Sequence, residues 1–217
     1  MFRLSIVGAK GGVGKSTLAY YLALEFSKNK KVLIVSIDGS RTLSEIFNVS
    51  GSLLDNTDFY YEKGNLSFIS FSSGGKDVSI DTVENIYLQY IIGKDIVIVD
   101  NPVHLGKDII LEYSAFSKMS NTRNYILGVS SPQSFVITAT KNFLKEYSSA
   151  LSSNFNEIGI VINFFKGDKI DEFKVYTRIF TIPFIKELLY KGFWNIETPK
   201  EFKCLSKTIL NILENEG

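Results

Sequence analysis

The chain has 217 residues, of which 45% are hydrophobic and 22% charged, and its formal net charge is +1. These values fit one soluble globular domain, residues 1–217, and exclude a strong overall field that attracts nucleic acid or anionic lipid. The only cysteine, Cys204, cannot form an intrachain disulfide, and no iron–sulfur cluster or cysteine zinc cage is expected within one chain.

Buried strands are predicted where short apolar runs end at polar or glycine positions. In chain order these runs are Phe2–Val7, Val32–Ile37, Leu66–Phe71, Ile96–Val99, Tyr125–Val129, Ile158–Phe164 and Arg178–Ile182. Helical periodicity predicts helices over Thr17–Ser27, Asp81–Ile92, a segment from Pro132 to Leu151, and Lys200–Leu213. The less regular stretches are expected to be loops or short helices, and these are Asn48–Gly64 and Lys166–Lys174.

Apolar strands that alternate with helices predict an α/β fold, with a doubly wound, mostly parallel sheet covered by helices on both faces. Ligands bind such sheets at the carboxyl ends of the strands. Polar residues follow three of the predicted strands directly: Gly8–Lys15, Asp38 and Asp100. No secretory signal and no apolar stretch of about 20 residues is visible, so a cytoplasmic location is expected.

A Walker A pattern, G-x-x-x-x-G-K-[ST], runs from Gly8 to Ser16 between a predicted strand and a predicted helix. Glycines let successive backbone N–H groups point at phosphate oxygens, and the helix N-terminus adds partial positive charge. We expect Lys15 to lie between the β- and γ-phosphates, Ser16 to bind Mg²⁺ and Thr17 to reach the α-phosphate. The context predicts a P-loop NTPase that binds a nucleoside triphosphate with magnesium.

The segment Lys10–Thr17 resembles the deviant Walker A signature of the family that contains MinD, ParA, ArsA and the nitrogenase iron protein. The resemblance implies a homodimer with ATP sandwiched between two subunits, in which Lys10 reaches the partner's phosphates. Such a lysine acts like an arginine finger. The predicted nucleotide-binding residues in this segment are Lys10, Gly11, Gly12, Val13, Gly14, Lys15, Ser16 and Thr17.

Two aspartates follow predicted strands and are interpreted through the same resemblance. The stretch from Ser36 to Phe47 is similar to switch I of the ArsA and Get-type branch, which implies that Asp38 orients the attacking water and contacts the magnesium shell. Asp100 ends a Walker B pattern and is expected to bind magnesium through water. The predicted catalytic residues are therefore Lys10, Lys15 and Asp38, and the predicted metal ligands are Ser16, Asp38 and Asp100.

The segment after Asp100 departs from the family pattern. The residues Asp100-Asn101-Pro102 resemble the first three positions of switch II of MinD, but the position of the family's glycine holds His104, and Gly106 comes two residues later. That glycine's N–H normally meets the γ-phosphate, so the efficiency of hydrolysis is open. His104, the sole histidine, is assigned a structural role.

The base pocket is predicted from the ends of two later strands. Asn163 stands where the family places an adenine-contacting asparagine, and Ile182-Pro183 resembles the segment whose backbone lines the base. An amide side chain pairs with N6 and N7 of adenine, and the guanine reader N-K-x-D is absent. The favoured nucleotide is therefore ATP, with Asn163 and Pro183 at its base.

The first functional hypothesis is an ATP-hydrolysing dimerisation switch of the ParA/MinD type that positions or partitions DNA or a protein complex. Its hydrolysis is expected to be slow and stimulated by a protein activator. The alternatives are an ArsA/Get-like targeting or transport ATPase, a small-molecule ligase or kinase, and a nucleotide sensor that scarcely hydrolyses. DNA binding through Lys28, Lys30 and Lys31, or through Lys166, Lys169, Lys174 and Arg178, stays open. Membrane binding is less favoured, because the amphipathic segment Lys200–Leu213 is expected to close the core.

Overall fold

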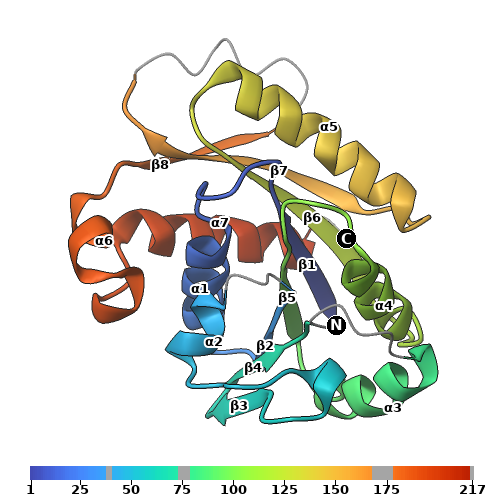
Figure 1. The fold of residues 1–217 in the computed structure, drawn as a ribbon. Coiled ribbons are helices and arrows are strands. Elements are labelled where there is room, and N and C mark those ends of the chain that lie inside the picture. Colours follow the sequence, from blue (N-terminus) through green and yellow to red (C-terminus); the bar gives the residue numbers. More distant parts are fainter. Residues whose placement is uncertain (38–40, 73–78, 168–177, 216–217) are drawn as a thin grey trace.

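The structure is a computed structural model that describes residues 1–37, 41–72, 79–167 and 178–215. These residues form an eight-stranded sheet in the order β3-β4-β2-β5-β1-β6-β7-β8 (Figure 1). Neighbouring strands run parallel except β3 and β4, which pair antiparallel at one edge. The predicted α/β fold, with a mostly parallel sheet and helices on both faces, is confirmed.

The strands span Phe2–Val7 (β1), Val32–Ser36 (β2), Tyr60–Lys63 (β3), Leu66–Ser70 (β4), Ile96–Asp100 (β5), Arg123–Ser130 (β6), Asn156–Phe165 (β7) and Ile179–Pro183 (β8). The α-helices span Lys15–Phe26 (α1), Thr42–Ile46 (α2), Ile80–Ile91 (α3), Lys107–Phe116 (α4), Ser134–Ala150 (α5), Lys186–Lys191 (α6) and Lys200–Asn215 (α7). Short 3-10 helices lie at Leu53–Asp55 (η1) and Phe193–Asn195 (η3).

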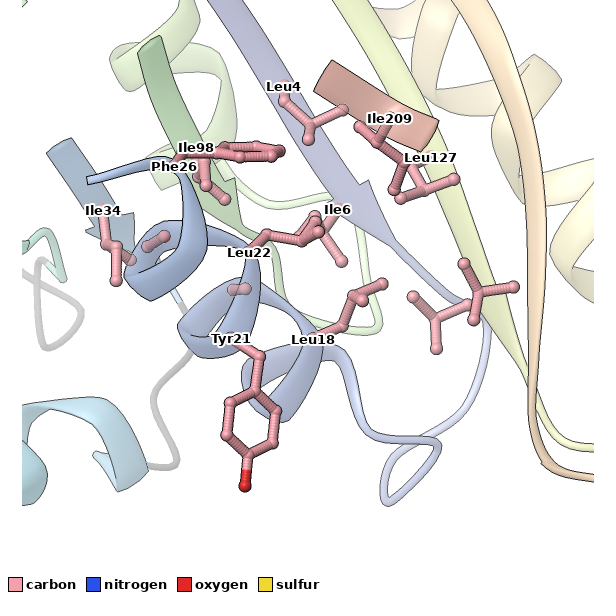
Figure 2. Close-up of a cluster of buried hydrophobic side chains, with 14 of the residues drawn as sticks. Leu4, Ile6, Leu18, Tyr21, Leu22, Phe26, Ile34, Ile98, Leu127 and Ile209 are labelled. Carbon is pink, nitrogen blue, oxygen red and sulfur yellow. The ribbon is translucent and has the colours of Figure 1, made fainter. Parts of the chain in front are cut away.

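The core consists of two apolar layers, one on each face of the sheet, because successive side chains of a strand point to opposite faces. On β5, Ile96 and Ile98 pack in the layer under α1 and α7, whereas Val97 and Val99 pack in the layer under α3, α4 and α5. Figure 2 shows the first layer, in which Leu18 and Leu22 of α1 meet side chains of β1, β5 and β6. Strands buried on both faces explain why their sequences are apolar throughout.

The C-terminal helix α7 packs its apolar stripe against the core, as the sequence predicts. Phe202 and Ile209 are at most 1% exposed, and the helix lies beside α1. A face that is already buried in the protein is not free to enter a lipid surface. Among the described residues, no helix is long and apolar enough to span a bilayer.

Several elements differ from the sequence-based expectations. The region Asn48–Gly64, expected as loops or short helices, contains the edge strand β3, and none of α2, α4, α6 and η3 was predicted. The edge strand is half-exposed and carries Glu62 and Lys63, so it lacks the apolar run that marks the central strands. Of the other irregular region, residues 168–174 lie outside the described residues.

Candidate nucleotide-binding site

The Walker A segment forms the connection from β1 to α1. β1 ends at Val7, and α1 begins at Lys15, directly after Gly14. Gly14 has φ +96°, and a Cβ at this position would stand 2.3 Å from Nδ2 of Asn163. A glycine is therefore required here both by backbone conformation and by space. The loop places the N-terminus of α1 at the carboxyl edge of the sheet, as the motif predicts.

A cavity of about 460 Å³ opens beside this loop. Its volume is in the range of small-molecule sites. Lys15 lines the cavity and is 7% exposed, so its ammonium group is held in a largely desolvated position where it attracts phosphate strongly. The polar part of the wall consists of Gly11, Gly12, Gly14, Lys15, Ser16, Thr17, Thr42 and Asn163.

Asp100 lies fully buried at the end of β5, opposite Ile6 on β1 and Ser36 on β2. Because β1 leads into the phosphate loop, this carboxylate comes close to the start of that loop. Ser16 lines the cavity and Asp100 does not. A hydroxyl in the wall and a buried carboxylate behind it fit Mg²⁺, since this ion keeps several waters and takes one or two protein ligands. Among the described residues no three His, Cys, Asp or Glu side chains gather as a caged metal site would require. Asp38 lies outside the described residues.

Asn163 joins the end of β7 to the phosphate loop. Its Nδ2 donates to the carbonyl of Val13 at 3.0 Å, and its Oδ1 accepts from the N–H of Phe164, also at 3.0 Å. The side chain is 6% exposed and lines the cavity. One Nδ2 hydrogen and one Oδ1 lone pair are left after these two bonds. The amide therefore braces the loop, and its contact with adenine stays a prediction.

Replacing Asn163 with alanine should weaken ATP and ADP binding by about 2- to 12-fold, because one buried hydrogen bond contributes about 0.5–1.5 kcal/mol. Calorimetric titration with each nucleotide measures this. Asn195→Ala is the matched control, since this amide also donates to a carbonyl, that of Lys191 at 2.8 Å, but lies outside the cavity. Equal affinities for wild type and Asn163→Ala would show that the brace does not matter for binding.

The cavity continues into an apolar half that the sequence did not predict. Pro183, expected at the base, ends β8 and is exposed, and most of the wall is formed by the residues that follow it. None of the α6 side chains is fully buried, and Ile185, Leu188 and Phe193 pack only at the edge of the core. An apolar wall next to a phosphate loop is suited to the flat face of a nucleobase. Its members are Val103, Phe164, Phe184, Ile185, Leu188, Leu189 and Phe193.

The first lysine of the motif, Lys10, is exposed and is not among the residues that line the cavity. Its Nζ lies 4.7 Å from the ring centroid of Phe135. In the switch II segment, His104 is exposed, and Gly106 directly precedes α4 as its N-cap. Gly106 has an extended backbone with φ −132° and open space at its Cβ position, so this site does not itself require a glycine.

A buried polar network lies behind the switch II segment, on the side of α3, α4 and α5. Asn101, the residue after Asp100, donates from Nδ2 to the carbonyls of Ile6 at 3.2 Å and Val99 at 3.1 Å. Its Oδ1 accepts from the Tyr147 hydroxyl at 3.1 Å. The Tyr147 hydroxyl oxygen also lies 3.3 Å from Oγ of Ser5. Asn101 is thereby fixed to β1 and α5.

The charged part of this network is an ion pair between Arg3 and Glu112, both 0% exposed. Arg3 donates to Oγ of Ser5 at 2.6 Å, and Tyr87 donates to Glu112 at 2.6 Å. The guanidinium carbon lies 5.1 Å from the ring centroid of Tyr113, close enough for a cation–π contact. β1, α3 and α4 are joined by these contacts. The signal for this pair in the sequence is a charged residue, Arg3, inside an apolar strand.

Burial sets the protonation of this network. It disfavours the charged form of Arg3, but the negative charge of Glu112 outweighs this and raises the pKa of the guanidinium above its usual value. Burial, with the adjacent charge of Glu112, also raises the pKa of the Tyr87 phenol well above its usual range. The tyrosine therefore stays protonated and keeps donating to the carboxylate, which leaves a charged pair with every partner hydrogen-bonded.

Comparison with protein families gives one match. The model of the CobQ/CobB/MinD/ParA nucleotide binding domain, CbiA, matches residues 4–192. Curated relatives with a shorter match are the ATPase GET3 of Phaeosphaeria nodorum and the ATPase get3 of Pyrenophora tritici-repentis. Each is 47% identical over 47 residues, which is 21% of this chain and only 14% of the relative.

Solved structures share the fold along almost the whole chain. A Borrelia burgdorferi B31 protein described as a plasmid partition protein, bound to AMPPNP, is 19% identical, with a TM-score of 0.75 and coverage of 99% of this chain and 98% of that one. The MinC:MinD cell division protein complex of Aquifex aeolicus is 17% identical, with a TM-score of 0.72 and coverage of 97% of this chain and 96% of that one. The apo McdA of Cyanthece is 15% identical, with a TM-score of 0.70 and coverage of 96% of this chain and 100% of that one. At these identities the likeness shows the fold.

Proposed function

The chain belongs to the family of CobQ/CobB/MinD/ParA nucleotide-binding domains, and from this premise we propose that it is an ATP-dependent dimerisation switch. Two copies close face to face around bound ATP, and hydrolysis separates them. One observation carries the proposal: Lys15 lines the phosphate cavity of its own chain, whereas Lys10 is exposed outside it. A cation that avoids its own cavity is available to the nucleotide of a second copy.

Each site residue has a role in this proposal. Lys15 and the N–H groups of the loop bind the phosphates, and Asn163 holds the loop while its remaining polar atoms read adenine. Ser16 and Asp100 hold Mg²⁺, which neutralises charge on the phosphates. Asp38 orients the attacking water. The apolar wall around Phe184 and Leu188 covers the base.

The solved structures suggest the kind of process. One such protein is described as a plasmid partition protein, and another is solved as a complex of MinD with MinC. By analogy we propose that the ATP-bound dimer holds a cargo or a protein partner in the cytoplasm, with hydrolysis stimulated by a protein activator. DNA is the less supported cargo, because Lys28 and Lys30 are paired with Glu25 at 2.6 Å and Glu214 at 2.7 Å.

Light scattering without nucleotide, with ADP–Mg²⁺ and with ATP–Mg²⁺ tests the switch. We expect a monomer in the first two conditions and a dimer with ATP, because ATP binds across the interface and shifts the equilibrium towards the dimer. The Asp38→Ala variant should remain dimeric with ATP for longer than the wild type, and the Lys10→Ala variant should form no ATP-dependent dimer. A wild type that is monomeric in all three conditions would contradict the proposal.

A second candidate is a nucleotide sensor that binds ATP and scarcely hydrolyses it. It is favoured by the switch II segment, in which His104 replaces the usual glycine and Gly106 caps α4. A single-turnover measurement on the ATP-bound dimer separates the two. Release of phosphate on the timescale of dimer dissociation supports the switch, and a stable ATP dimer supports the sensor.

A further inference from the structure

The contact between Lys10 and Phe135 joins the phosphate loop to the start of α5. The β6–α5 connection runs next to the loop because β6 pairs with β1, with Val7 opposite Gly128. This places Phe135, the second residue of α5, within 4.7 Å of the Lys10 ammonium. The ring is 61% exposed, so it contributes little to the core. An exposed aromatic ring with a functional lysine over it calls for an explanation other than folding.

When nucleotide is bound, electrostatic attraction alone would draw the Lys10 ammonium towards the phosphates in the cavity of its own chain. The residues that follow it, Gly11 and Gly12, line the phosphate cavity, and a lysine has a flexible stem of four carbons. Phosphate groups carry several negative charges and attract any nearby ammonium group. Without a competing contact, Lys10 can fold back onto the phosphates of its own chain and is then lost to a partner.

We infer that Phe135 is a positioning residue, which holds the Lys10 ammonium outside its own cavity and presents it to the nucleotide of a second copy. This inference rests on the proposed dimer and names a residue that regulates the same site. The face of an aromatic ring attracts a cation at this distance, with a strength of about 0.5–1 kcal/mol at exposed sites. That strength is enough to bias the side chain and weak enough to release it when the partner's phosphates arrive.

The test replaces Phe135 with leucine, which keeps an apolar side chain and removes the ring. AMPPNP affinity is measured by calorimetry at protein concentrations where the chain is monomeric. We expect Phe135→Leu to bind AMPPNP about 2- to 5-fold more tightly, because Lys10 now reaches its own phosphates. Dimerisation with AMPPNP should weaken by about 5- to 30-fold, since two lysines per dimer are misplaced. Phe135→Trp, which retains a ring, should behave as wild type in both measurements.

The same substitution in a Lys10→Ala background completes a double-mutant cycle. In that background Phe135→Leu should leave the affinity of the monomer for AMPPNP unchanged. A loosened α5 would weaken both monomer affinity and dimerisation, whereas the inference requires them to move in opposite directions. Unchanged monomer affinity in Phe135→Leu, or the same change without Lys10, would overturn it. The monomer cycle does not depend on dimers, so a wild type that never dimerises would refute the proposed switch and leave the Lys10–Phe135 contact separately testable.

Discussion

Replacing Glu112 with alanine is expected to lower the free energy of unfolding by about 3–5 kcal/mol, the loss typical when one partner of a buried ion pair is removed. The substitution leaves the Arg3 guanidinium at 0% exposure without its carboxylate, and it also removes the acceptor of the Tyr87 hydroxyl. Urea unfolding followed by circular dichroism measures the change. If the alanine variant does not fold, Glu112→Gln keeps the shape of the side chain and removes only its charge.

The double variant Arg3→Met, Glu112→Leu is the control, because it removes both charges and keeps apolar volume. Replacing a buried ion pair with apolar residues of similar volume often leaves the stability unchanged or increases it. We therefore expect the double variant to regain most of the stability that Glu112→Ala loses. A loss below about 1 kcal/mol in Glu112→Ala would mean that water reaches this pair and that the burial argument is wrong.

The sheet could be predicted from the sequence because its central strands are buried on both faces. β1, β2 and β5 contain apolar runs that end at the same edge, and the predicted limits of β1 agree with the structure. α4 escaped prediction because Glu112 interrupts its apolar stripe. That residue is buried only because Arg3 meets it, 109 positions earlier in the chain. A contact at such a separation cannot be seen in a local pattern.

The candidate site also has one half that could be predicted from the sequence and one half that could not. Its phosphate half follows from a contiguous motif, and the structure places Lys15, Ser16 and Thr17 in the wall of one cavity. Its apolar half could not be predicted, since Leu188 and Phe193 belong to short helices with no buried side chains. Such residues show neither helical nor strand periodicity. They gain a role only when the chain after β8 folds against the phosphate loop.

The network behind switch II bears on how ATP could control the chain. Asn101 is fixed to β1 by the Ile6 carbonyl and to α5 by Tyr147. The residues from His104 to Gly106 are exposed up to the start of α4. We therefore expect a nucleotide-dependent movement of this segment to begin in the exposed stretch, since α4 is held from behind by Glu112. Nucleotide-dependent changes should appear at the surface near His104 before they reach the core.

The two lysines of the phosphate loop should fail in different ways when each is replaced with alanine. Lys15→Ala removes the cation inside the cavity and should weaken both ATP and ADP binding by about 10- to 150-fold, since hydrogen bonds to charged groups contribute about 1.5–3 kcal/mol. Lys10→Ala leaves the cavity wall intact and should bind ADP as wild type does. Under the proposed sandwich it should lower the rate of hydrolysis by about 10³- to 10⁵-fold, as loss of an arginine finger does.

Titration with ADP and steady-state phosphate release, measured on the same preparations, check this difference. Lys10→Arg is the matched variant for charge, and partial recovery of hydrolysis would show that a cation at this position acts on the reaction. If Lys10→Ala binds ADP as poorly as Lys15→Ala, then Lys10 serves its own cavity and the exposed position outside it is not functional. If Lys10→Ala hydrolyses ATP at the wild-type rate, the reaction is completed within one chain, and dimer closure is not required for catalysis.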